Sequence, residues 1–133
     1  MANKELLLQL QNCFDRCKPI FIAMGDEVRL TIITALAWTA LTGYPPGKLE
    51  EEPVPSADTH TSRLKGLSVK EITNTTKLSR PAISHHLKIL KNAGLVDSMQ
   101  TGTSNIYYIT FDATTDLLHG LTTTLYEIRE GNE

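Results

Sequence analysis

Apolar residues recur every three or four positions near the start of the chain, which is the spacing of a helix with one buried face. This spacing predicts a first helix over residues 4–17. We expect Pro19 to end it, because proline lacks a backbone N–H and clashes with the preceding turn. The apolar stripe consists of Leu6, Leu10, Cys13 and Cys17, widened by Leu7 and Phe14.

Two further stretches have helical spacing. From about Asp26 to Leu41, apolar residues occupy nearly every face, so we predict a second helix in the buried centre of the fold. Asp26 or Gly25 would cap its N-terminus. A last helix is predicted near the C-terminus, where the apolar stripe consists of Leu117, Leu118, Leu121, Leu125 and Ile128.

The regular pattern stops between Gly43 and Gly66. Prolines, glycines and the acidic run Glu50–Glu52 exclude a continuous helix or a central strand there. We interpret residues 43–66 as a surface excursion, with room for a short hairpin, inside a single domain that spans residues 1–133.

Capping signals mark two short helices after the excursion. The S-x-x-E box at Ser68–Glu71 predicts a helix that ends near Asn74. After a turn, a second capping serine predicts a helix over Ser79–Ala93, with Pro81 tolerated in its first turn. Gly94 then supplies the left-handed residue at which helices commonly end.

Residues 95–100 and 105–111 have the pattern of two strands, and a glycine-containing tip at Thr101–Ser104 joins them. They predict a β-hairpin. The element order is therefore helix, helix, helix, helix, strand, strand, helix, which is mainly α with a small β-hairpin. Two capped helices joined by a tight turn and followed by a hairpin predict a winged helix-turn-helix.

The helix at 80–93 has two unlike faces when it is unrolled at about 100° per residue. One side is apolar, with Ala82 and His86 at its margin, and consists of Ile83, Leu87 and Leu90. The opposite side is small, polar and basic, and consists of Pro81, Ser84, His85, Lys88 and Asn92. Such a face can enter the major groove of DNA. We expect Ser84 and His85 to reach base edges and Lys88 to contact phosphate.

The charge distribution agrees with this interpretation. The chain of 133 residues has a net charge of −2. Residues 62–92 carry +6, which leaves −8 for the remainder, so positive charge is concentrated around the two short helices. The basic residues of this block, set against the single acid Glu71, are Arg63, Lys65, Lys70, Lys77, Arg80, Lys88 and Lys91.

Composition excludes several other classes. The chain is 41% hydrophobic and 21% charged, has two cysteines, and contains no apolar run of membrane-spanning length. We expect a cytoplasmic protein with reduced thiols. The sequence has no phosphate loop, nucleophile elbow or H-E-x-x-H motif, so we expect neither an enzyme nor a cofactor.

The chain resembles the ArsR/SmtB family of prokaryotic winged-helix transcriptional repressors. The most specific similarity is the run SHHLKILKNAGL over residues 84–95. The resemblance implies a homodimer built on the first and last helices, with each recognition helix in one half-site of an inverted-repeat operator, and repression that an unidentified effector relieves. The segments that carry it are Met24–Ile33, Leu67–Ile72, Leu78–Val96 and Gly102–Tyr108.

These arguments together predict two sets of site residues. The hairpin tip lacks the Arg or Lys that is usual in the family, so wing contacts would rely on hydroxyls, Asn105 and backbone amides. The expected DNA-binding residues are Ser79, Arg80, Pro81, Ser84, His85, Lys88, Thr103 and Asn105. The expected dimer-interface residues are Leu6, Leu10, Phe14, Leu117, Leu121 and Leu125.

A metal site is not expected. The segment Leu67–Ile72 lacks the Cys-x-Cys pair of metal-sensing relatives, and the last helix lacks a second histidine beside His119. Two interpretations of Cys13 and Cys17 stay open: they are apolar packing residues, or they form a thiol or metal sensor. A further alternative is a dimeric winged-helix interaction module that does not bind DNA.

Overall fold

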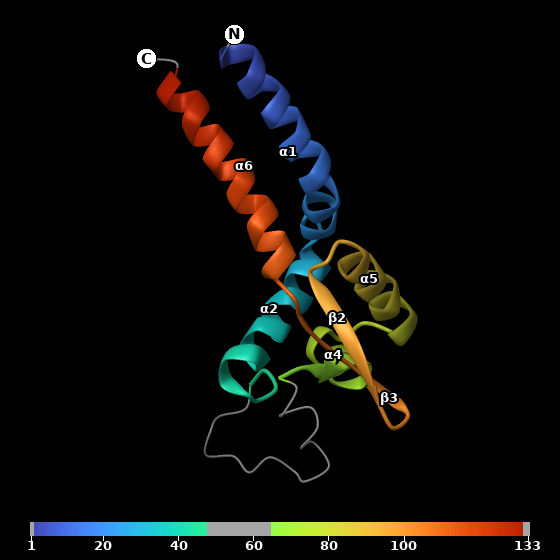
Figure 1. The fold of residues 1–133 in the computed structure, drawn as a ribbon. Coiled ribbons are helices and arrows are strands. Elements are labelled where there is room, and N and C mark those ends of the chain that lie inside the picture. The colour runs from blue at the N-terminus through green and yellow to red at the C-terminus, as the bar shows by residue number, and fades with distance from the viewer. Residues whose placement is uncertain (1, 48–64, 132–133) are drawn as a thin grey trace.

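A computed structural model describes residues 2–47 and 65–131, which fold into five helices and three short strands (Figure 1). The hairpin envisaged within the 43–66 excursion lies outside these residues. In chain order the elements are α1 (Ala2–Met24), α2 (Glu27–Thr42), β1 (Leu67–Ser68), α4 (Val69–Thr76), α5 (Arg80–Asn92), β2 (Val96–Thr101), β3 (Ser104–Ile109) and α6 (Asp112–Gly131).

Figure 1 shows α1 and α6 side by side and antiparallel, with both chain ends at their far end. The remaining elements gather around the other end of this pair, where the last turns of α1 enter their core. Its sheet is antiparallel in the order β1-β3-β2. The β2–β3 hairpin extends away from the α1–α6 pair.

The first helix continues past Pro19 to Met24, so the prediction that Pro19 ends it is wrong. A proline inside a helix costs roughly 3 kcal/mol. Burial of the residues after Pro19 offsets this cost, because Ile20 and Ala23 reach the core only if the helix continues past the proline. Burial has overridden the local signal.

The second helix agrees with prediction to within one residue at each end. The carboxylate of Asp26 accepts hydrogen bonds from the backbone N–H groups of Val28 (2.9 Å) and Arg29 (3.1 Å). The hydrogen bond from Arg29 is the main reason that the pKa of Asp26 is lowered. Gly43, at φ 81°, ends the helix in the left-handed region.

The capping signals around the short helices are confirmed. Ser68 Oγ accepts from the backbone of Glu71 (3.2 Å), and Glu71 Oε1 accepts from the backbone of Ser68 (2.9 Å). Ser79 Oγ accepts from the N–H of Ala82 (3.4 Å) at the start of α5. Both caps fix where α4 and α5 begin, and hence the turn between them.

That turn passes through Lys77, which closes α4 with φ 64°. A side chain in the left-handed region costs roughly 1–2 kcal/mol, and glycine avoids most of this cost. We therefore expect Lys77→Gly to raise the free energy of unfolding by up to about 1 kcal/mol, as measured by urea denaturation. Lys77→Ala is the matched control, because it removes the same charge without relieving the backbone. Equal stability of the two variants would contradict this explanation.

The first strand, β1, was not predicted, because the sequence pattern indicated only the two strands of the hairpin. It has only two residues, Leu67 and Ser68, which pair with Tyr107 and Ile106 of β3. Two residues are too few to show the alternation that identifies a strand. Gly66 allows the close approach, because a Cβ there would overlap the backbone carbonyl oxygen of Tyr107.

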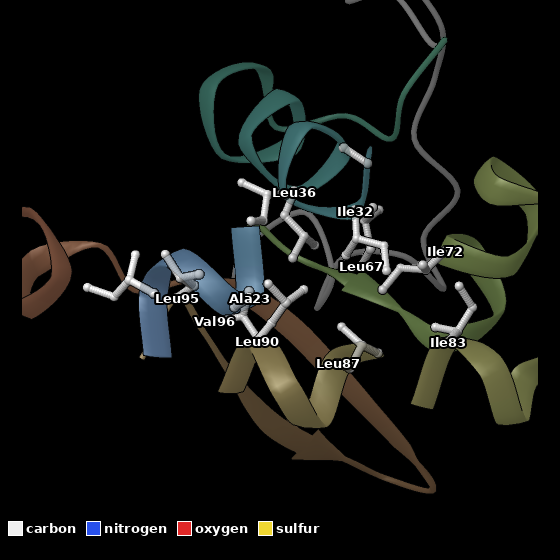
Figure 2. Packing of buried hydrophobic residues seen from close by; sticks show 13 residues of the cluster. Ala23, Ile32, Leu36, Leu67, Ile72, Ile83, Leu87, Leu90, Leu95 and Val96 are labelled. Carbon is white, nitrogen blue, oxygen red and sulfur yellow. The ribbon is translucent and has the colours of Figure 1, made fainter. Parts of the chain in front are cut away.

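The core fixes the rotation of α5 about its axis. Ile83, Leu87 and Leu90 are buried and point toward the centre of the core in Figure 2. Around them Figure 2 shows side chains from α1, α2, β1 and α4, from the start of β2 and from Leu95 just before it. The predicted phase of the helix is correct, and its opposite side faces outward. The surrounding side chains are Ala23, Ile32, Leu36, Leu67, Ile72, Leu95 and Val96.

Candidate nucleic-acid interface

The outward side of α5 carries the polar residues that the sequence singled out. Pro81, Ser84, His85 and Lys88 are all exposed, whereas Ala82 and His86 at the margin are half-buried. Such small and polar side chains leave the helix narrow enough for the major groove of DNA. The structure thus places these residues together on one accessible helix face, and their contact with DNA remains a prediction.

The N-terminal end of α5 adds two groups to this face. Ser79 and Arg80 are exposed at the first turn. The Ser79 hydroxyl oxygen accepts the capping bond, so its hydrogen is still available to a phosphate oxygen. The helix N-terminus itself carries partial positive charge, which favours an anion.

The hairpin tip is polar and uncharged. Gly102, at φ 64°, turns the chain, and Thr103 and Asn105 are exposed beside it. Gln100 Nε2 donates to the carbonyl oxygen of Gly102 at 3.4 Å, which braces the tip. The wing therefore exposes a hydroxyl and an amide beside the turn, and their contact with DNA stays a prediction.

One lysine of the basic block is directed elsewhere. Lys91 Nζ donates to Ser98 Oγ (3.0 Å) and lies 3.7 Å from Asp97 Oδ1, so it joins α5 to β2. Lys88 is exposed on the outward face of the same helix. The two lysines thus differ in their surroundings although both contribute to the same local charge. This distinction could not be deduced from charge counting.

The α1–α6 pair carries the residues expected at a dimer interface, but part of that surface is already covered within the chain. Leu6, Leu10 and Leu117 are half-buried. Leu121 is only 6% exposed because α1 packs against α6, so this expected interface residue is largely covered within the chain. The large side chains of the expected set that remain exposed are Phe14 (46%) and Leu125 (44%).

Sequence reasoning missed part of this apolar surface. Phe21 and Ile22 are exposed on the last turns of α1. They were overlooked because the helix was expected to end at Pro19. The heptad spacing of Leu7, Phe14 and Phe21 was the signal that could have revealed them, since it places all three on one side of a helix.

The two cysteines take part in the packing of α1 against α6. Cys17 is fully buried, and its thiol donates to the carbonyl oxygen of Leu117 at 3.5 Å. Burial raises the pKa of Cys17, with a smaller contribution from Cys13, so the reactive thiolate is disfavoured. The Sγ of Cys13 lies 3.6 Å from the Oγ1 of Thr124. Cys17 thus behaves as a packing residue.

Cys13 also lines a hollow of about 430 Å³ between α1 and α6, together with Arg16 and Asp116. Within residues 2–47 and 65–131, no three His, Cys, Asp or Glu side chains gather as they would around a metal ion. Over the same residues, none of the helices combines the length and the hydropathy that crossing a bilayer requires.

Comparison with known proteins identifies relatives of the chain. Residues 63–98, which include α4 and α5, match the model of the bacterial regulatory protein, arsR family. An uncharacterized HTH-type transcriptional regulator of Methanocaldococcus jannaschii is 30% identical over 105 residues, which cover 79% of this chain and 90% of the relative.

Solved structures share the fold. A predicted DNA-binding transcriptional regulator from E. coli matches with a TM-score of 0.53 and 26% identity, over 88% of this chain and 97% of that one. An ArsR-like regulator from Rhodococcus sp. RHA1 matches with a TM-score of 0.61 and 21% identity, over 88% and 84%. A homodimeric winged helix-turn-helix DNA-binding domain from Mycobacterium bovis matches with a TM-score of 0.53 and 21% identity, over 98% and 92%. The predicted winged helix-turn-helix fold is confirmed.

Proposed function

Because this chain belongs to the ArsR family of HTH-type, DNA-binding transcriptional regulators, a family that is not enzymatic, we propose that it is a homodimeric repressor of an inverted-repeat operator. The observation that carries the proposal is the outward face of α5, where Ser84, His85 and Lys88 are exposed opposite the buried Ile83 and Leu87.

The recognition helix would read sequence through its small polar residues. Ser84 and His85 donate to or accept from base edges in the major groove, and Lys88 binds a phosphate beside it. Ser79 and Arg80 bind the sugar-phosphate backbone of the DNA at the N-terminus of α5, where Pro81 keeps the first helical turn narrow. Thr103 and Asn105 of the wing contact the phosphates next to the helix.

A dimer supplies two such helices. Phe14 and Leu125 leave apolar surface on the outside of the α1–α6 pair, which a second copy would cover. The M. bovis domain with the same fold is described as homodimeric. A two-fold dimer presents its recognition helices about one turn of DNA apart, or a multiple of it, which requires an inverted repeat.

The protein would repress transcription if its operator overlaps a promoter. An effector would release it from DNA by favouring a dimer whose recognition helices no longer match the spacing of the half-sites. The effector itself is unidentified. The buried thiol of Cys17 does not favour a thiolate-based trigger.

The test is a selection of bound sequences from random DNA by the purified protein. We expect the selected sites to contain two inverted half-sites whose centres lie about 10 base pairs, or a multiple of that, apart. A single asymmetric half-site would contradict the dimeric arrangement.

A salt titration with random DNA separates this proposal from the alternative, an interaction module that does not bind DNA. A DNA-binding protein that contacts several phosphates loses affinity steeply as salt rises. Absence of binding even at low salt would favour the interaction module instead.

A further inference from the structure

The side chain of Arg29 joins three helices. Its Nε donates to the carbonyl oxygen of Ala23 at 2.7 Å, and its Nη2 donates to that of Ile22 at 3.2 Å. Both carbonyls belong to the last turn of α1. Its Nη1 lies 3.2 Å from Nδ1 of His86, on the recognition helix α5. One guanidinium in α2 therefore connects the end of α1 to α5.

The position of Arg29 in α2 indicates that its contacts with α1 and α5 orient its side chain. It lies in the first turn of α2, where the helix dipole disfavours a positive charge. The same charge is favoured at the C-terminal carbonyls of α1, which it reaches. The guanidinium is thus stabilised by the carbonyls of α1 and by His86 of α5, and not by the dipole of α2.

The bond to His86 requires the neutral ring. A guanidinium has only donors, so Nδ1 of His86 must accept, and the ring proton must lie on Nε2. A protonated imidazole has no acceptor. Protonation would therefore remove this hydrogen bond and leave two cations 3.2 Å apart at their nearest nitrogens.

None of the charged groups on the elements around α5 can restore this hydrogen bond, because a protonated ring has no acceptor. Asp26 attracts a charged His86, but its pKa is lowered, mainly by the backbone N–H of Arg29, so it stays ionised as the medium turns mildly acidic. The Glu71 carboxylate of α4 accepts from the backbone of Ser68.

Other charged or titratable groups lie on α5 or on elements packed against it. Asp97 of β2 pairs with Lys91, and Arg16 of α1 lines the hollow beside α6. His85, whose ring centroid is 5.8 Å from that of His86, is the other titratable ring nearby, and an experiment must separate its effect.

We propose that Arg29 and the neutral form of His86 are a positioning pair that holds the recognition helix against the end of α1, and that protonation of His86 releases it and weakens operator binding. The inference rests on the DNA-binding function proposed above. It also connects the proposed dimer surface to the recognition helix. Helix α1 carries apolar residues of that surface, and its last turn supplies the carbonyls that accept from Arg29.

The test measures operator affinity at about pH 8 and about pH 5.5, the range in which histidine changes charge. All proteins carry His85→Gln, which removes the other histidine of α5, so any affinity lost with His85 is the same in every protein compared. With His86 present, we expect affinity to fall about tenfold on acidification, as befits the loss of a hydrogen bond to a charged group. With His86→Gln, which keeps an acceptor but does not titrate, we expect a change of less than about twofold.

A second comparison, at about pH 8, separates positioning from general stability. His86→Gln should bind within about threefold of the protein that keeps His86, whereas His86→Leu, which has no acceptor, should bind about tenfold more weakly while still folded by circular dichroism. Equal pH profiles with and without the His86→Gln substitution would overturn the inference. Failure of the unmodified protein to bind DNA at all would instead overturn the proposed function.

Nitrogen-15 NMR of the unmodified protein provides a check that needs no variant. The geometry requires His86 to carry its proton on Nε2 at about pH 8. An Nδ1–H tautomer would overturn the inference even if all variants misfolded.

Discussion

His85→Ala is expected to weaken operator binding by about five- to a hundredfold while it leaves the affinity for random DNA almost unchanged. The side chain is exposed on the outward face of α5, opposite the buried Leu87, so its removal should not disturb the core. A lost base contact typically costs about 1–3 kcal/mol of discrimination. We expect Ser84→Ala, too, to weaken operator binding and to leave the affinity for random DNA almost unchanged. Electrophoretic mobility shifts with operator and random duplexes measure both affinities.

Lys88→Ala should instead weaken binding to both duplexes and lower the slope of log affinity against log salt by about one unit, because it removes one phosphate contact. Lys91→Ala is the matched control. It deletes the same charge from the same helix, but Lys91 is directed at Ser98 and Asp97 of β2. If the two substitutions reduced affinity and salt slope equally, net charge and not a specific contact would explain binding.

Local signals were sufficient to predict the elements that form the helix-turn-helix. The caps at Ser68 and Ser79 act within three residues of themselves, and the period of Ile83, Leu87 and Leu90 fixes which side of α5 faces outward. Such features depend on neighbours in sequence, so a single sequence contains them.

Features that depend on distant parts of the chain could not be predicted. The helix continues through Pro19 because residues beyond it fill the core, and β1 exists because β3 lies beside it. Leu121 is covered by α1, which is remote in sequence. Each outcome is decided by tertiary packing, which outweighs local propensity.

The same reasoning applies to the candidate site. Its exposed face follows from helical period, but the contact between Arg29 and His86 joins residues 57 positions apart. Neither residue type nor spacing indicated it. His86 was predicted only to lie beside the core, and its acceptor role became visible once α2 and α5 were placed together.

The pair of substitutions Phe14→Glu and Leu125→Glu is expected to convert the dimer into monomers and to weaken operator binding at least about a hundredfold. Both side chains are exposed in the single chain, at 46% and 44%, and neither belongs to the buried core, so charge there should not disrupt the core. Burying a large apolar side chain is worth roughly 1.5–3 kcal/mol, and a two-fold interface would bury each residue twice. Sedimentation velocity at micromolar concentration measures the oligomeric state.

Leu41→Glu is the control for this pair. Leu41 is 87% exposed near the end of α2, which Figure 1 places at the end of the molecule away from the free ends of α1 and α6. It adds the same charge to an accessible leucine, so we expect the dimer and the operator affinity to survive. We expect weaker operator binding by the monomer because one recognition helix reads only one half-site, and the second helix no longer binds at the high effective concentration that the dimer provides. A Phe14→Glu, Leu125→Glu protein that still sediments as a dimer would show that the two copies meet through another surface.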